Sequence, residues 1–258
     1  MRYKVEKGSA KGTIVFVHGN SSSSIVFDEV LKSKLISQTK IAVDLPGHGN
    51  NAEAEDEVAK FSIENYRAKL IELINTIDDD ILLVGNSLGG HLAIEIAEDI
   101  ERLKGLIIFG TPPLKKPLNL EQAFLQVEPL QTFFTEYPTD IEIEPAIHQV
   151  SYAKECVPKL ITDFKQANPK VRKAIMTDIA EDKFLDQYAV FTHLKPPKFI
   201  IAGKQDPSVN PEYLETVKDN CGESCELIKF DGCGHYPSIE KPEEFIKTLQ
   251  TIVLRIFK

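Results

Sequence analysis

A serine flanked by glycines lies between an apolar run and a helical pattern in the first half of this 258-residue chain. The apolar run covers residues 81–84, and the turn after it is Gly85-Asn86-Ser87-Leu88-Gly89. The apolar positions of the helical pattern are Leu88, Leu92, Ile96 and Ile100. Because glycine lacks a side chain, a strand and a helix approach closely here. The segment therefore predicts a strand, a sharp turn and a helix, the repeating unit of an α/β fold.

Ser87 is the candidate nucleophile of this turn. A Gly-x-Ser-x-Gly turn strains the serine backbone and presents the hydroxyl at the edge of the sheet. The N–H of Leu88 then lies at a helix N-terminus, where an anion is favoured. The alternative is an ordinary helix start with Ser87 as its cap. The residues further along the chain favour the nucleophile.

An acid and a histidine follow Ser87, each after a short apolar run. Residues 199–202 predict a buried strand that leads to Asp206, and residues 227–230 predict a strand that leads to His235. A serine hydroxyl needs an imidazole to take its proton, and a carboxylate holds that imidazole in the correct tautomer. Ser87, Asp206 and His235 are therefore the predicted catalytic residues. The structural alternatives are a proline turn at Asp206 and an ordinary loop histidine at His235.

A fourth loop completes the predicted site. Residues 13–17 predict a strand that leads into His18-Gly19-Asn20-Ser21-Ser22-Ser23. We expect the N–H groups of Asn20 and Leu88 to bind the oxygen of the substrate when it becomes negatively charged. His18 is interpreted as organising this loop and not as a second base.

These motifs together resemble the α/β-hydrolase superfamily over nearly the whole chain except a middle segment. The matching motifs are His18-Gly19-Asn20, Asp44-Leu45-Pro46-Gly47-His48-Gly49, the turn at Ser87, Gly203-Lys204-Gln205-Asp206, Gly234-His235-Tyr236-Pro237 and Glu240-Lys241-Pro242-Glu243. The resemblance implies an α/β fold with a doubly wound, mostly parallel sheet and a helical cap insertion. It also implies a Ser–Asp–His triad, but it specifies no substrate.

Three positions refine what the resemblance implies. Relatives that act on haloalkanes or epoxides carry Asp at the turn, so Ser87 disfavours those reactions. Some hydrolases place the acid after the strand at residues 106–109, but here Gly110-Thr111-Pro112-Pro113 follows, without a carboxylate. The block that contains His48 is usually a structural turn in this family, so we assign His48 no catalytic role.

Strand and helix patterns alternate over residues 1–110 and 197–258, which we expect to form the hydrolase core. Apolar spacing predicts a helix over 63–77 and a last helix that begins near Pro242. Residues 3–5 are the single strand that we expect before the strand at residues 13–17. Because the family usually has two strands there, we expect the sheet to lack an edge strand.

Residues 111–196 depart from this alternation and predict a helical cap over Ser87. Helix-like stretches cover 120–134, 146–165 and 169–179, with prolines between and within them and no strand pattern. The link is too long for a simple crossover. We expect most of its aromatic residues to form the cap's own core and a few to face an apolar pocket. Such a pocket favours an uncharged, partly apolar acyl group.

The net charge is −9, which argues against nucleic acid or an anionic membrane as a partner. The acidic run at 53–57 is expected to be a solvated loop. No apolar N-terminal signal and no run long enough to span a bilayer is found, so we expect a cytoplasmic protein. No pattern in the sequence indicates an oligomeric state.

The cysteines raise a metal hypothesis that the spacing disfavours. Cys221, Cys225, Cys233 and His235 cluster in the sequence, but Cys-x-x-x-Cys is not the usual zinc spacing. His235 is also assigned to the triad. A Cys221–Cys225 disulfide is the alternative, and free thiols are expected in a reducing compartment. We therefore predict neither a metal nor a cofactor.

The leading functional hypothesis is hydrolysis of a small carboxylic ester or related acyl compound, lactones included, through an acyl-enzyme on Ser87. A second hypothesis is C–C bond hydrolysis of a diketone-type compound, because the Gly85-Asn86-Ser87 start resembles some enzymes of that kind. The same triad also fits peptidase and acyltransferase activity. A hypothesis from another class is a ligand-binding receptor on a hydrolase scaffold, since fold does not settle function.

Overall fold

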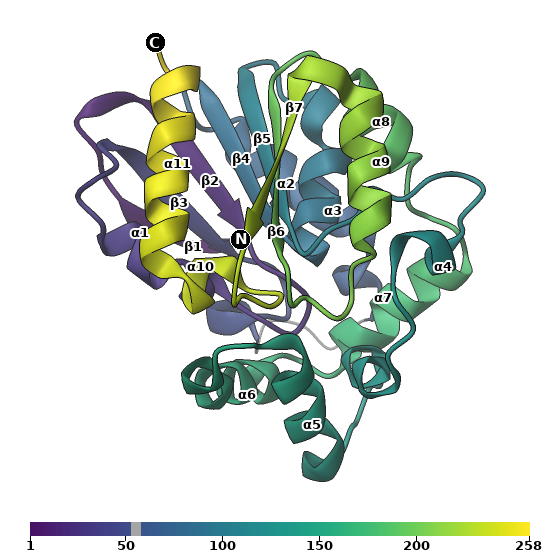
Figure 1. The fold of residues 1–258 in the computed structure, drawn as a ribbon. Helices are drawn as coiled ribbons and strands as arrows, with labels where there is room; N and C mark the ends of the chain where they lie inside the picture. Colours follow the sequence, from purple (N-terminus) through teal and green to yellow (C-terminus); the bar gives the residue numbers. More distant parts are fainter. Residues whose placement is uncertain (53–57) are drawn as a thin grey trace.

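The computed structural model describes residues 1–52 and 58–258, which contain a seven-stranded sheet of order β1-β3-β2-β4-β5-β6-β7 (Figure 1). The strands are β1 Arg2–Glu6, β2 Ala10–Val17, β3 Gln38–Asp44, β4 Ile81–Asn86, β5 Leu103–Phe109, β6 Lys198–Gly203 and β7 Cys225–Phe230. β1 pairs with β3 in antiparallel fashion, and the other neighbours are parallel. This confirms the predicted α/β class and the single strand before β2. The predicted loop at 53–57 lies outside the described residues.

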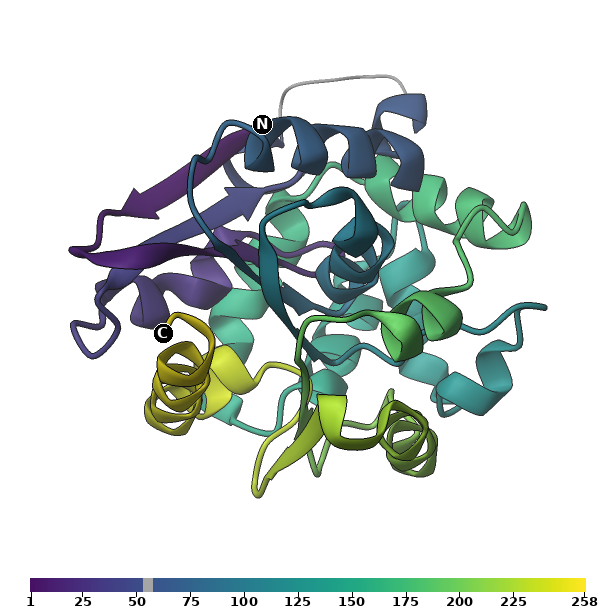
Figure 2. The same ribbon diagram turned by 90° about the horizontal axis from the view of Figure 1, so that it is seen from above.

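Helices cover both faces of the sheet (Figure 2). One face carries α2 Ile63–Ile74, α3 Leu88–Glu95, α8 Gln187–His193 and α9 Pro211–Cys221, and the other carries α1 Asp28–Lys32 and α11 Pro242–Ile256. Short helices fill the connections: η1 Ser24–Phe27, η2 Gly49–Asn51, η3 Val58–Phe61, η4 Ala97–Asp99, η7 Gly222–Ser224 and α10 Pro237–Glu240. The last long helix begins at Pro242, as predicted, whereas α2 ends at Ile74 and not at residue 77.

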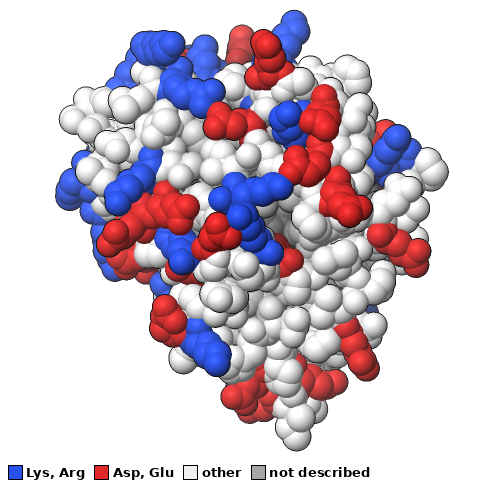
Figure 3. Space-filling view, in the orientation of Figure 1, with Lys and Arg blue, Asp and Glu red and all other residues white. Residues whose placement is uncertain are grey.

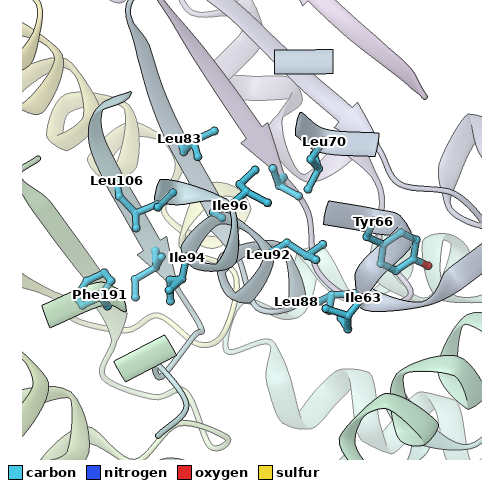
Figure 4. Packing of buried hydrophobic residues seen from close by; sticks show 14 of the residues in the cluster. Ile63, Tyr66, Leu70, Leu83, Leu88, Leu92, Ile94, Ile96, Leu106 and Phe191 are labelled. Carbon is cyan, nitrogen blue, oxygen red and sulfur yellow. The ribbon is translucent and has the colours of Figure 1, made fainter. Parts of the chain in front are cut away.

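The alternation of side chains along the strands builds two apolar clusters, one on each face. Val15 and Val17 of β2 belong to the first cluster, whereas Ile14 and Phe16 point into the second. In the first cluster, Leu92 of α3 packs among side chains of α2 and the sheet (Figure 4). The helix that follows Ser87 is therefore anchored in the core along its whole length, because residues 88–95 are all buried.

The link between β5 and β6 is described throughout and contains helices but no strand. Its helices before α8 are α4 Leu120–Ala123, η5 Glu128–Phe134, α5 Asp140–Val150, η6 Lys154–Cys156, α6 Val157–Gln166 and α7 Lys170–Ala180. They lie beyond the carboxyl ends of the strands, in the lower part of Figure 1. The last helix, α8, packs instead against α3 and α9.

Two helices predicted in this link are wrong in extent. The stretch 120–134 is broken after α4, because the N–H of Leu125 donates to Ser208 O at 2.9 Å. The stretch 146–165 is two helices, and α5 begins earlier, at Asp140, with a capping box from Thr139. The second break occurs where the N–H groups of Tyr152 and Ala153 donate to Glu240. Both breaks therefore arise from contacts with distant parts of the chain, which local apolar spacing does not encode.

Candidate active site

Ser87 occupies a strained turn between β4 and α3. Its backbone has φ 51° and ψ −121°, a conformation that a residue with a side chain rarely adopts. A Cβ on Gly85 would lie 2.4 Å from Gly89 O, and a Cβ on Gly89 would lie 2.1 Å from Val17 O. The glycines therefore allow the close approach of strand and helix that the sequence predicts.

Backbone and side-chain hydrogen bonds hold this turn from both sides. The N–H of Ser87 donates to Phe109 O at 2.9 Å. The carbonyl of Ser87 accepts from the N–H groups of Gly90 and His91 and from Thr111 Oγ1 at 2.9 Å. The end of β5 thus stabilises the strained serine, as a turn of this kind requires.

Asp206 and His235 come together, although they lie on different loops. His235 Nδ1 is 2.8 Å from Asp206 Oδ2, and the two side chains are only 8% and 6% exposed. The other carboxylate oxygen accepts from the N–H and the hydroxyl of Ser208, at 2.9 and 2.6 Å. Because Nδ1 donates to the carboxylate in this arrangement, Nε2 carries the lone pair that a general base needs.

The pair shifts the pKa values of both groups. Burial alone lowers the pKa of His235, but the charge of Asp206 and the hydrogen bond to it raise that pKa above its usual value. Burial alone raises the pKa of Asp206, whereas His235 and Ser208 bring that pKa below its usual value. An ionised Asp206 beside the imidazole stabilises the imidazolium form.

His235 lies beside the turn that carries Ser87. Asn86 Nδ2 donates to His235 O at 3.2 Å, and a Cβ on Gly110 would come within 2.6 Å of the His235 ring. The position after β5, where the sequence lacks a carboxylate, is therefore taken by the imidazole. No hydrogen bond joins Ser87 Oγ to His235 among the described residues. Such bonds are often long before substrate binds.

The loop after β2 lies against the nucleophile. A Cβ on Gly19 would lie 3.0 Å from Ser87 Cβ. Across residues 1–52 and 58–258, the N–H groups of Asn20 and Leu88 donate to no protein group. Asn20 is itself buried, with an exposed fraction of 9%. Both predicted oxyanion donors are therefore available to a ligand.

Two buried histidines hold this loop. His18 Nδ1 lies 2.8 Å from Gly19 O, and His18 Nε2 accepts from the N–H of Leu45 at 3.0 Å. His48 Nε2 accepts from the N–H of Ser21 at 3.1 Å. Burial lowers the pKa of both histidines, so both stay neutral at neutral pH. This confirms the loop-organising role expected for His18.

Glu240 connects the His235 loop to the segment between α5 and α6. Its carboxylate accepts from the N–H groups of Gly234, Tyr236, Tyr152 and Ala153, at 2.7–3.1 Å. The N–H of His235 donates to Val150 O at 2.8 Å. Glu240 belongs to one of the motifs of the family resemblance, but its sequence context indicates no role of this kind.

Three further residues of the site, Ser208, Asn86 and Arg172, were not predicted. Ser208 has a local signal, because an Asp-x-Ser turn favours a hydrogen bond from the serine back to the carboxylate. Asn86 is the variable residue of the Gly-x-Ser-x-Gly turn, and Arg172 lies in α7, far from every motif. The roles of Asn86 and Arg172 depend on contacts between distant segments, so no local pattern indicates them.

The cysteines and the histidine of the metal hypothesis are not brought together. Cys221 ends α9 and Cys225 begins β7, whereas Cys233 and His235 follow the end of β7. All four cysteines are free thiols. Over the described part of the chain, no group of three or more His, Cys, Asp or Glu side chains is arranged to hold a metal ion. Within the same residues, no helix is long and apolar enough to cross a membrane.

The comparisons with known proteins agree on one family. The sequence profile described as "Alpha/beta hydrolase family" matches residues 14–248. The pimeloyl-(acyl-carrier protein) methyl ester esterase of Xylella fastidiosa is 23% identical, over 93% of this chain and 94% of that protein. Monoacylglycerol lipase ABHD6 of Mus musculus is 23% identical, over 93% of this chain and 74% of that protein.

Solved structures have the same fold. N-acyl homoserine lactonase AidH, complexed with N-butanoyl homoserine, has a TM-score of 0.87 and 23% identity, over 97% of this chain and 91% of that one. A thermophilic esterase from Thermogutta terrifontis has a TM-score of 0.82 and 19% identity, over 100% and 94%. These likenesses establish the architecture around the site.

Proposed function

Because the chain belongs to the alpha/beta hydrolase family, we propose that it is a serine hydrolase that cleaves a small carboxylic ester, lactones included. The observation that supports this proposal most directly is the buried Asp206–His235 pair beside the strained turn of Ser87. The relatives support the reaction class, since they are named as an esterase and a lipase and the structural neighbours as a lactonase and an esterase.

The proposed reaction passes through an acyl-enzyme. Ser87 Oγ attacks the ester carbonyl while His235 Nε2 takes its proton. The N–H groups of Asn20 and Leu88 bind the oxyanion, and Asp206 stabilises the imidazolium. His235 then gives the proton to the leaving alcohol as the C–O bond breaks. Water, deprotonated by His235, attacks the acyl-enzyme, and His235 returns the proton to Ser87 Oγ as its bond to the acyl group breaks and the acid leaves.

We propose residues 111–196 as the cap and residues 1–110 and 197–258 as the core. The expectation that most cap aromatics form a core of their own is wrong in part. Phe184 and Phe191 belong to the cluster on the α2–α3 face of the sheet, and Tyr137 and Tyr152 are 68% and 58% exposed. The half-buried Phe133, whose carbonyl accepts from Asn20 Nδ2 at 2.6 Å, is the proposed apolar neighbour of the acyl group.

An uncharged acyl compound also fits the surface. In the view of Figure 3, the cap below the sheet is largely uncharged, and acidic side chains gather toward its lower end. Such a face favours neither nucleic acid nor another polyanion. Cytoplasmic location stays a prediction, which fractionation of cells that express the tagged protein would check.

The test is an activity screen of the wild type and Ser87→Ala over ester chain lengths, lactones, diketones and peptides. We expect turnover of short esters or lactones by the wild type. Ser87→Ala should retain only the part of the rate that comes from the oxyanion hole and binding, about 10³–10⁴ over water. A fluorophosphonate probe should label the wild type at Ser87 alone.

Three outcomes would redirect the proposal. Wild-type turnover by Ser87→Ala would exclude the acyl-enzyme. Preference for a diketone over every ester would support the C–C hydrolase. A wild type that neither labels nor turns over any compound in the screen would support the receptor.

A further inference from the structure

Three consecutive residues of the loop after β2 each contact a different element of the link between β5 and β6. Asn20 Nδ2 donates to Phe133 O at 2.6 Å, at the end of η5. Ser21 Oγ accepts from Arg172 of α7 at 3.1 Å. Ser22 Oγ donates to a carboxylate oxygen of α6 at 3.2 Å. The loop that carries the proposed oxyanion donor is therefore held in place by the cap.

Arg172 is the most constrained of these contacts. Its guanidinium is buried, with 4% of the residue exposed, and lies 4.6 Å from the ring centroid of Phe164. Nε donates to Thr135 O at 2.8 Å and Nη2 donates to Glu136 O at 2.9 Å, while Nη1 donates to Ser21 Oγ. Because the guanidinium is planar, two fixed carbonyls determine where the third donor points.

Ser21 transmits this position to Asn20. Ser21 has φ 51°, so its backbone is strained and needs fixed contacts. Its N–H donates to His48, and its hydroxyl donates to Asn20 Oδ1 at 3.2 Å while it accepts from Arg172. Asn20 is therefore held through its side chain and through the peptide that follows it.

We propose that Arg172 is a positioning residue: through Ser21 it holds the N–H of Asn20 where the oxyanion of the transition state forms. The proposal rests on the proposed esterase function and on Asn20 as oxyanion donor. Three of the five guanidinium N–H groups are used by protein oxygens. Arg172 therefore organises the loop and does not serve as a free cation for an acidic substrate.

The first test compares Arg172→Ala with Lys173→Ala on 4-nitrophenyl butanoate. Lys173 is the next residue of α7 and pairs with the carboxylate of Glu136, whose backbone carbonyl accepts from Arg172, but its side chain is 56% exposed and it does not reach Ser21. Loss of an oxyanion donor lowers kcat about 10²–10³-fold, so a displaced donor should lower kcat by about 10- to 100-fold. We expect KM to change less than about threefold, because uniform binding is retained, and Lys173→Ala to match the wild type.

A second readout separates the oxyanion from the rest of the pocket. Butylboronic acid forms a tetrahedral adduct with the serine and places an oxygen in the hole, whereas butyl 4-nitrophenyl ether occupies the pocket without a carbonyl. We expect Arg172→Ala to weaken boronate inhibition by the same factor as kcat and to leave ether inhibition unchanged. A general disturbance of the cap would weaken both inhibitors.

Ser21→Ala keeps the test decisive if Arg172→Ala does not fold. It removes the hydroxyl that joins Arg172 to Asn20 and leaves the guanidinium with its two carbonyls. We expect the same pattern of kcat loss, and wild-type kcat in Ser21→Ala would overturn the proposal. Where Arg172→Ala folds as well, the double variant should be no slower than the slower single variant, because both changes cut one link. Additive losses in the double variant would overturn the proposal.

The other outcomes are also distinct. Equal kcat values for Arg172→Ala and Lys173→Ala, or a rise in KM alone for acidic esters, would overturn the positioning role while the esterase function stands. A wild type that hydrolyses no ester would remove the proposed function itself, and the positioning role with it.

Discussion

The turn that carries Ser87 is held by backbone groups close to it, whereas the loop that carries His235 is held by groups from distant parts of the chain. Around Ser87, the glycines of the motif and the end of β5 supply the contacts. Around His235, the acceptors are Asp206 after β6, Glu240 of α10 and Val150 of α5. The nucleophile thus depends on one strand–turn–helix unit and its neighbouring strands, and the base depends on the assembly of core and cap.

This difference indicates which substitutions the turn of Ser87 and the loop of His235 tolerate. A substitution at the turn acts by steric collision, because the backbone leaves no room for a side chain. A substitution around His235 acts through orientation and charge, because side chains set the position of the ring. Four substitutions test this contrast, and their expected effects decrease from Asp206→Asn to Asp163→Asn.

Asp206→Asn should have the largest effect on catalysis. Loss of the acid of a triad lowers kcat about 10⁴-fold while the fold persists, because the imidazole adopts the wrong tautomer. The raised pKa of His235 means that activity falls as pH drops through a value above 6.5. Without Asp206, the acid limb of kcat/KM should move to lower pH. A loss smaller than about tenfold would assign the role to another carboxylate.

Gly89→Ala should collapse the turn of Ser87. The new Cβ would meet Val17 O at 2.1 Å and His18 O at 2.5 Å, both backbone atoms that cannot move aside. We expect a loss of more than about 3 kcal/mol in the free energy of unfolding, beyond the usual range for point variants, with loss of probe labelling at Ser87.

Gly222→Ala is the control that adds backbone strain without a collision. Gly222, unlike Gly89, has a positive φ of 60°, and a Cβ there meets no atom within 4 Å. Its cost should be the strain of the positive-φ backbone alone, about 1–3 kcal/mol. Denaturant unfolding of both variants measures the difference, and equal losses would contradict the prediction that the collision at Gly89 costs more than backbone strain alone.

Glu240→Gln should affect the base and leave the turn of Ser87 intact. One carboxylate oxygen accepts from three N–H groups and the other from Tyr236. An amide retains the first oxygen at best and leaves the N–H of Tyr236 without an acceptor, which costs about 1–3 kcal/mol. We expect kcat to fall by about tenfold, in line with an orientational effect on a general base.

Glu243→Gln, in the same motif but with a side chain that is 91% exposed, is the control and should match the wild type. Comparison of kcat and of unfolding for the two variants checks the prediction. Wild-type kcat in Glu240→Gln would mean that Asp206 alone orients His235.

The contrast also explains what the sequence predicts. The fold, the turn of Ser87 and the order of Asp206 and His235 follow from local patterns, because apolar spacing and glycines act over a few residues. The strands that lead into the loops of Asp206 and His235 are predicted in the same way, from short apolar runs. The hydrogen bond between Asp206 and His235 is expected from chemistry once the loops meet at one edge of the sheet.

Other features depend on segments that meet only in the folded chain. The contacts of Glu240 span 87 and 88 residues to Ala153 and Tyr152, and that of Arg172 with Ser21 spans 151. The break in the predicted helix at 146–165 has the same origin, since the N–H groups of Tyr152 and Ala153 bind Glu240 and do not continue a helix. No local pattern carries this information, so these roles emerge only from the structure.

The smallest expected effect concerns Asp163 of α6, which accepts at 3.2 Å from Ser22 Oγ in the loop after β2. Burial, opposed by the Ser23 and Ser22 hydroxyls, raises the pKa of Asp163 from 3.8 to about 6. The folded state thus favours the protonated form. Its stabilising effect is complete below the unfolded value of 3.8 and is lost as pH rises through about 6.

Asp163→Asn removes this cost because the amide does not ionise and still accepts from Ser22. Above about pH 7 we expect the variant to be more stable than the wild type by about 1–3 kcal/mol, the size that two pKa units imply. Below about pH 4 the two should unfold alike, and thermal unfolding across this range measures the difference. Asp140→Asn makes the same charge change at a cap side chain that is 79% exposed, and it should show no such trend. If the two variants respond to pH equally, net charge governs the effect and not the burial of Asp163. A trend confined to Asp163→Asn would show that the burial of this cap acid, which accepts from Ser22 in the loop after β2, governs the effect.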